Sequence, residues 1–115
     1  MNRLTKRLAD LKKQNKKALV AYLVAGDPDI ESTLQLMNLF VESGVDVLEI
    51  GVPFTDPIAE GPIIQKAHDR ALEKNISLTA IFEMVQKFRE TDNTTPIVLM
   101  GYLNTFLSHK KIIEE

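Results

Sequence analysis

The chain has 115 residues, 44% of them hydrophobic and 26% charged, and its formal net charge at pH 7 is −2. These values suit one small soluble globular domain, and so weak a charge argues against nucleic acid or an acidic membrane as the main partner. Disulfides and thiolate metal sites are excluded because there is no cysteine, and no apolar run approaches the roughly 20 residues that span a bilayer.

The basic N-terminal stretch, residues 1–17, predicts a short amphipathic helix, because Leu4, Leu8 and Leu11 fall on one helical face. It lacks the apolar h-region and the cleavage site of a secretory signal. We therefore expect it to pack on the body of the domain. A transit peptide or a membrane-surface helix is the less favoured alternative.

Residues 18–26, ALVAYLVAG, form a nearly unbroken apolar run and predict a strand that is buried on both faces. The next two residues favour a helix start, with Asp27 as the N-cap and Pro28 in the first helical position. Apolar residues at helical spacing over 30–41 predict that helix, and Gly44 is suited to end it.

Residues 45–52, VDVLEIGV, form a second buried run, and a turn-rich segment with the acids Asp56 and Glu60 follows it. Pro62 is well placed to begin another helix after this segment, and Ser77 can cap a further one. The sequence thus predicts one strand followed by two helices.

A third buried run, TPIVLMGYL, covers residues 95–103, and residues 105–115 predict a final helix. We expect residues 1–115 to form a single α/β unit, because no linker or repeat interrupts the pattern. Apolar strands that alternate with helices imply a parallel sheet, in a (βα)₈ barrel or an open doubly wound fold. In either fold, chemistry lies at the carboxyl ends of the strands.

Glu49 is the residue that the pattern marks most strongly as functional. Charge is costly on a carboxylate at a buried strand end, and such a group suits general acid/base chemistry near neutral pH. A structural glutamate that binds loop amides or a distant cation is the open alternative. Asp56 and Glu60 can divide acid and charge-stabilising roles with it, although a solvated acidic loop near a helix N-terminus is the simpler interpretation.

The two histidines, His68 and His109, have no ligand at metal-like spacing. We expect each to be a surface or helix residue, and we predict no metal site. Tyr102 and Asn104 lie two residues apart beyond the third strand and can face one pocket, with packing as the default role of the tyrosine. The glycines match no nucleotide-binding motif.

The run LEIGVPFTDPIAEGPIIQ, with YLVAGDPD upstream and PIVLMGYLN downstream, closely resembles the tryptophan synthase α subunit family. The family's signature around the second strand reads roughly LE(L/I)GVPFSDPLADGP-x-IQ, and the resemblance covers essentially the whole chain. It implies a TIM barrel, and a cytoplasmic lyase of tryptophan biosynthesis. This lyase cleaves indole-3-glycerol phosphate to indole and glyceraldehyde 3-phosphate without a metal or an organic cofactor. Indole then passes to a β subunit that carries pyridoxal phosphate, in an α2β2 assembly.

The resemblance also implies catalytic and substrate-binding residues. Glu49 matches the general acid/base, which moves protons between the glycerol hydroxyl and indole C3. Glu60 stands where the family's second acid, usually Asp, binds the indole N–H. A misplacement of about 1 Å, such as the extra methylene can cause, can cost on the order of 10²-fold in rate. Tyr22 replaces a usual Phe of the substrate pocket, and Met100 and Tyr102 match further pocket positions.

Three further positions match residues that contact the β subunit in the family, namely Pro53, Asp56 and Asn104. Pro53 and Asp56 belong to the turn-rich segment after the second strand, and Asn104 follows the third strand. The resemblance therefore implies a partner surface close to the active site.

A (βα)₈ barrel takes about 250 residues, so we expect an incomplete barrel with an N-terminal helix and the first three βα units. Such a piece lacks the phosphate-binding loops, and we expect it to be catalytically poor or inactive alone. One alternative is a non-catalytic half-barrel fragment that docks on a β subunit or a complementary segment. Another is an autonomous α/β module of flavodoxin-like size with a different ligand.

Overall fold

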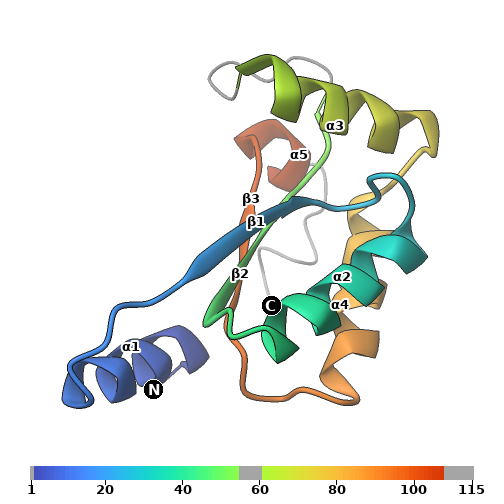
Figure 1. Ribbon diagram of the computed structural model, residues 1–115. Coiled ribbons are helices and arrows are strands. Elements are labelled where there is room, and N and C mark those ends of the chain that lie inside the picture. The colour runs from blue at the N-terminus through green and yellow to red at the C-terminus, as the bar shows by residue number, and fades with distance from the viewer. Residues whose placement is uncertain (1, 55–60, 108–115) are drawn as a thin grey trace.

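The computed structural model describes residues 2–54 and 61–107, which form one parallel sheet with helices around it (Figure 1). In chain order the elements are α1 (Arg3–Lys13), β1 (Val20–Val24), α2 (Ile30–Glu42), β2 (Val47–Gly51), α3 (Gly61–Glu73), α4 (Leu78–Arg89), β3 (Ile97–Met100) and α5 (Leu103–Leu107). The predicted order of helices and strands is confirmed.

The sheet has the order β1-β2-β3, and both strand pairs are parallel. The three carboxyl ends therefore lie at one edge, with α3 and α5 nearby (Figure 1). The register places Tyr22 beside Glu49 and Glu49 beside Val98. These three side chains share one face of the sheet, because side chains alternate along each strand.

The main core lies on the other face of the sheet. Its buried members come from β2 and the residues next to the strands, from α2 and from α4: Ala25, Met37, Leu48, Ile50, Val52, Leu78, Ile81, Met84 and Phe88. Because Leu48 and Ile50 point into this core, Glu49 between them points away from it. A smaller cluster of Val24, Ala67 and Ala71 joins α3 to β1.

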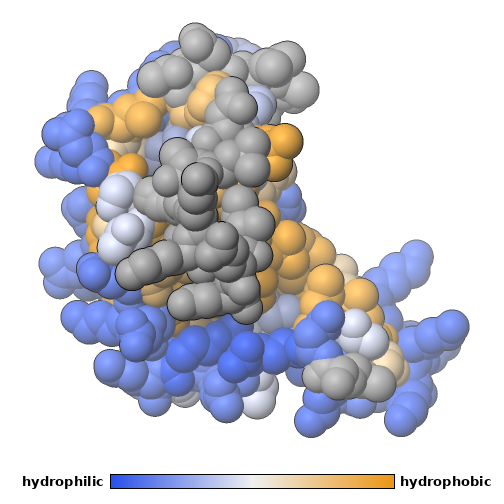
Figure 2. All heavy atoms as spheres, turned by 180° about the vertical axis from the view of Figure 1, so that it is seen from behind, coloured by the Kyte–Doolittle hydropathy of each residue, from blue (hydrophilic) through white to orange (hydrophobic). Residues whose placement is uncertain are grey.

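Strands β1 and β3 are not buried on both faces, contrary to the prediction from their apolar runs, whereas β2 is buried except at Glu49. Val20, Val98 and Met100 are 51%, 37% and 39% exposed. All three lie on the face of Glu49, which the described helices leave largely open. Seen from behind, the described part of the molecule shows apolar surface between hydrophilic side chains (Figure 2).

Helix α2 begins later than predicted. The carboxylate of Asp29 accepts a hydrogen bond from the Ser32 N–H at 2.7 Å, so Asp29 is the N-cap. The prediction that Asp27 caps the helix and Pro28 opens it is wrong. The Asp27 carboxylate instead accepts two hydrogen bonds from Arg70 of α3, at 2.6 and 2.9 Å.

The other predicted boundaries need smaller changes. Ser77 caps α4 as predicted, accepting a hydrogen bond from the Ala80 N–H at 3.1 Å. Pro62 is the second residue of α3 rather than the first. Strand β3 is shorter than the apolar run 95–103. Of the predicted final helix, the part beyond residue 107 lies outside the described residues.

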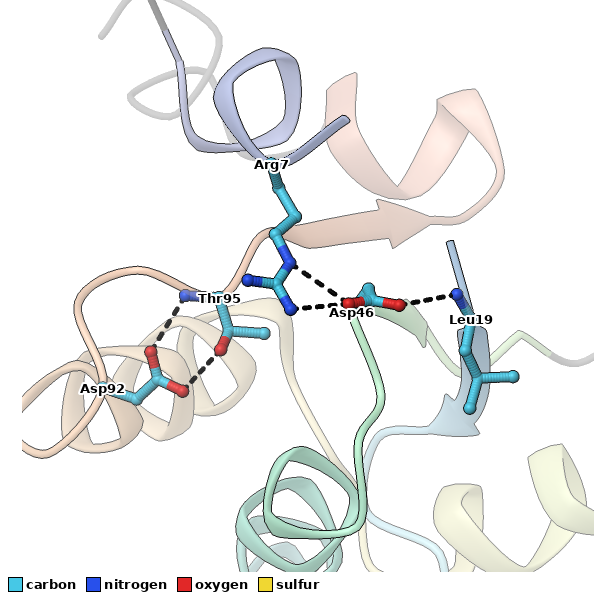
Figure 3. A network of polar contacts seen from close by, with 5 residues as sticks. All are labelled: Arg7, Leu19, Asp46, Asp92 and Thr95. Atoms are coloured by element: carbon cyan, nitrogen blue, oxygen red, sulfur yellow. Dashed lines mark hydrogen bonds and ion pairs between the residues drawn. The ribbon is translucent and has the colours of Figure 1, made fainter. Parts of the chain in front are cut away.

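A buried carboxylate fixes α1 to the amino-terminal edge of the sheet (Figure 3). Asp46, 9% exposed and directly before β2, accepts hydrogen bonds from the Arg7 guanidinium and from the Leu19 N–H, the latter at 2.9 Å. The expectation that α1 packs on the body of the domain therefore holds. Its apolar face is only partly covered, since Leu8 remains 45% exposed.

Asp46→Asn is expected to lower the free energy of unfolding at pH 7 by about 1–3 kcal/mol, because it weakens a charged, buried hydrogen-bond acceptor. The Leu19 N–H, followed by the Arg7 guanidinium, holds the pKa of Asp46 below its ordinary value of 3.8, against the opposing effect of burial. This stability is therefore present above pH 3.8 and is lost as the pH falls through the lower pKa of the folded state. In urea unfolding, the difference between the two proteins should shrink in acid, and a difference that does not change with pH would contradict this role.

Candidate active site

A shallow pocket of about 230 Å³ opens on the face of Glu49. It is lined by Tyr22 of β1, Glu49 of β2, Met100 of β3 and Ile64 of α3. The structure thus brings together three residues that the sequence placed in one site. Their catalytic and substrate-binding roles remain predictions.

Glu49 differs from its neighbours in β2, since it is half-buried and the other four residues of the strand are buried. Leu48 and Ile50, both 0% exposed, anchor the strand to the main core. Glu49 therefore lies on a rigid strand with its carboxylate toward the pocket. A ligand in this pocket would meet one acidic group among mostly apolar walls.

Close contact between β1 and β2 shapes one wall of the pocket. A Cβ atom at Gly51 would lie 2.2 Å from the Tyr22 hydroxyl oxygen, so the Tyr22 side chain lies over a glycine, two residues beyond Glu49. Only a residue without a side chain leaves room for the tyrosine in this position.

Gly51→Ala is expected to displace the Tyr22 ring and to lower the free energy of unfolding by about 1–3 kcal/mol, as overpacked sites do. The cost should be smaller in a Tyr22→Ala background, where the clashing atoms are absent. Chemical denaturation of the four proteins in this cycle measures the coupling. Equal costs in both backgrounds would show that the tyrosine does not set the need for glycine.

Beyond β2 the chain is held by a histidine of α3. His68 is 1% exposed, and its Nδ1 accepts a hydrogen bond from the Phe54 N–H at 3.0 Å. The prediction of a surface or helix residue is met by the helix, in which His68 is buried rather than exposed. The sequence spacing indicates this burial, because His68 falls on the helical face of Ile64 and Ala71.

Phe54 and Tyr102 join the ends of β2 and β3. Their rings stack with centroids 4.3 Å apart and an interplanar angle of 25°. Tyr102 is half-buried and is not among the residues that line the 230 Å³ pocket. Its predicted contact with substrate therefore stays a prediction, while its contact with Phe54 is a property of the fold.

The predicted partner-facing residues are only partly described. Pro53 is buried, directly before Phe54. Asn104 belongs to α5, but its side chain is outside the described part of the structure. Asp56, Glu60 and His109 also lie outside the described residues.

Two further observations concern residues 2–54 and 61–107 alone. They contain no group of three or more His, Cys, Asp or Glu side chains placed to hold a metal ion. None of their helices is both long and apolar enough to cross a membrane.

Comparison with known proteins gives the chain a family. A family model described as tryptophan synthase alpha chain matches residues 8–113. The chain belongs to the tryptophan synthase alpha chain family. The alpha chain of Alkalilimnicola ehrlichii is 55% identical over 104 residues, and that of Neisseria meningitidis serogroup B is 60% identical over 88 residues.

Solved alpha chains show the same fold. A crystal structure of the tryptophan synthase alpha chain from Legionella pneumophila is 50% identical, with a TM-score of 0.90 over 95% of this chain. The tryptophan synthase complex from Pyrococcus furiosus is 42% identical, with a TM-score of 0.71 over 83% of this chain. The predicted fold class, an incomplete TIM barrel of three βα units after an N-terminal helix, is confirmed.

The match covers only part of these relatives. The chain spans 38% of the Alkalilimnicola ehrlichii alpha chain and 34% of the Neisseria meningitidis one. It likewise spans 40% of the Legionella pneumophila structure. The described residues thus correspond to less than half of a tryptophan synthase alpha chain.

Proposed function

We propose that the chain supplies the acid/base part of a tryptophan synthase α active site, which cleaves indole-3-glycerol phosphate to indole and glyceraldehyde 3-phosphate. The observation that carries the proposal is the position of Glu49. It is the one half-buried residue of a buried strand, and it lines a pocket with Tyr22 and Met100. Family membership supplies the reaction for which such a group is suited.

The cleavage needs two proton movements, one at indole C3 and one at a hydroxyl oxygen two bonds away. Indole C3 gains a proton, the bond from C3 to the first glycerol carbon breaks, and its electrons return to the indole ring. The hydroxyl on that glycerol carbon loses its proton as the aldehyde forms. One carboxyl group that faces both atoms can take the hydroxyl proton and protonate C3.

The remaining predicted residues have supporting roles in this proposal. Tyr22 and Met100 provide apolar walls for the indole ring, and Tyr102 contributes a further contact with the substrate. Glu60 binds the indole N–H and stabilises positive charge that develops on the ring. None of these steps uses a metal or an organic cofactor. In this proposal pyridoxal phosphate belongs to the partner β subunit.

We further propose a cytoplasmic protein that works with a tryptophan synthase β subunit. One similar structure from Pyrococcus furiosus is described as part of an α2β2 complex with mutual activation. Pro53, Asp56 and Asn104 are the proposed contact residues. Of these, Pro53 directly precedes Phe54, whose ring stacks on Tyr102 and so links the ends of two strands next to the pocket.

The test is indole release from indole-3-glycerol phosphate. The 115-residue chain is measured alone and after mixing with a second segment, which contains the part of the Legionella pneumophila α chain that this chain does not match. We expect little turnover alone and clear turnover from the mixture. A folded mixture without turnover would contradict the proposal. Binding of the chain to a β subunit in that case would instead favour the docking fragment.

A further inference from the structure

We propose that His68 is a positioning residue of the candidate site, which fixes the backbone at Phe54 and so aligns the ends of β2 and β3. The proposal rests on the proposed function for its catalytic consequence. Its structural part stands on the hydrogen bond from the Phe54 N–H to His68 Nδ1 at 3.0 Å.

The sheet itself cannot hold Phe54. The last sheet-type hydrogen bond of this segment runs from the Val52 N–H to the Met100 carbonyl oxygen at 2.8 Å. Pro53 has no N–H to donate. The Phe54 N–H is therefore the next donor along the chain, and its acceptor is a side chain of α3 rather than a neighbouring strand.

The hydrogen bond specifies the chemical state of the imidazole. Nδ1 can accept only when it carries no proton, so His68 is neutral and its proton is on Nε2. The side chain is 1% exposed, and the small residue Ala71 lies one turn further along the same helical face. A buried, close-packed ring has little room to turn, so the hydrogen bond holds the Phe54 N–H in place.

Two other contacts make the effect of His68 reach the pocket. The ring of Phe54 stacks on Tyr102, which follows β3. Helix α3, which carries His68, also supplies Ile64 to the wall of the Glu49 pocket and is joined to Asp27 after β1 through Arg70. Loss of the His68 acceptor should therefore release the end of β2 from both α3 and the Tyr102 ring.

A matched pair of variants separates this role from simple packing. His68→Asn can keep an acceptor close to the position of Nδ1, because the side-chain oxygen of Asn reaches a similar point. His68→Leu keeps apolar volume and removes the acceptor. In the 115-residue chain, hydrogen exchange at the Phe54 amide should be about fivefold or more faster in His68→Leu and close to wild type in His68→Asn. The ¹⁵N spectrum of the His68 ring should show the proton on Nε2.

The catalytic readout uses the mixture described above for indole release. We expect His68→Leu to lower kcat by roughly ten- to a hundredfold, with a much smaller change in KM, while His68→Asn restores most of the rate. Unchanged exchange at Phe54 in His68→Leu, or a proton on Nδ1, would overturn the proposal. Equal kcat for wild type and a folded His68→Leu variant would do the same. Absence of turnover in the wild type counts against the proposed function, and the exchange and ring spectra then decide the role of His68.

Discussion

Glu49→Gln is expected to lower the rate of indole release by about 10²–10⁴-fold, the usual contribution of a positioned general acid/base. The substitution keeps the size of the side chain and removes its charge and its ability to exchange a proton. Because Leu48 and Ile50 anchor β2 in the core, the strand should stay in place. The measurement is steady-state turnover of indole-3-glycerol phosphate by the chain mixed with the rest of the barrel.

Glu42→Gln is the matched control. Glu42 is an exposed residue at the end of α2, so its replacement removes the same charge outside the pocket. Its rate should equal that of the wild type. If Glu49→Gln is as active as Glu42→Gln, Glu49 is a structural glutamate, the alternative that the sequence left open.

Met37→Ala is expected to lower the free energy of unfolding by about 2–5 kcal/mol, because it leaves a cavity in the main core. Met37 is 0% exposed and belongs to the cluster that joins α2 and α4 to the sheet. A domain of this size has a total stability of only about 5–15 kcal/mol, so the variant should lose a large share of it. Urea unfolding followed by circular dichroism gives the value.

Leu39→Ala serves as the control on the same helix. Leu39 lies two residues further along α2 and is 53% exposed. Truncation there removes apolar atoms without creating a cavity. It should therefore lower the free energy of unfolding by much less than Met37→Ala does. Similar losses at both positions would contradict the placement of the core on this face of α2.

The sequence predicted the parts of the fold that depend on local pattern. The apolar run around Leu48 and Ile50 identified β2, and the rule that parallel strands carry chemistry at their carboxyl ends placed Glu49 at the site. Ser77 was recognised as a cap because its effect acts within one helical turn. Tyr22, Glu49 and Met100 were expected in one pocket, and the structure brings them together there.

The features that were missed depend on partners distant in sequence. Asp29 rather than Asp27 caps α2, and Arg70, which lies 43 residues from Asp27, binds the Asp27 carboxylate. Likewise, His68 binds the Phe54 N–H, which lies 14 residues earlier.

The open face of the sheet could not be predicted from local pattern either. Apolar runs indicate that a strand can be buried on two faces, but not whether another element covers the second face. Val20 and Val98 are apolar and exposed on the side of Glu49. The composition of β1 and β3 therefore suits a closed barrel, while the described residues cover one face.

The most direct measurement is the activity of a chimera in which residues 8–113 replace the matching segment of the Legionella pneumophila α chain, which has a similar backbone with a TM-score of 0.90. If this chain provides a working acid/base, the chimera will release indole from indole-3-glycerol phosphate, and its Glu49→Gln variant will be nearly inactive. A folded chimera that releases no indole, or that releases it equally well with Gln at position 49, would contradict the assignment.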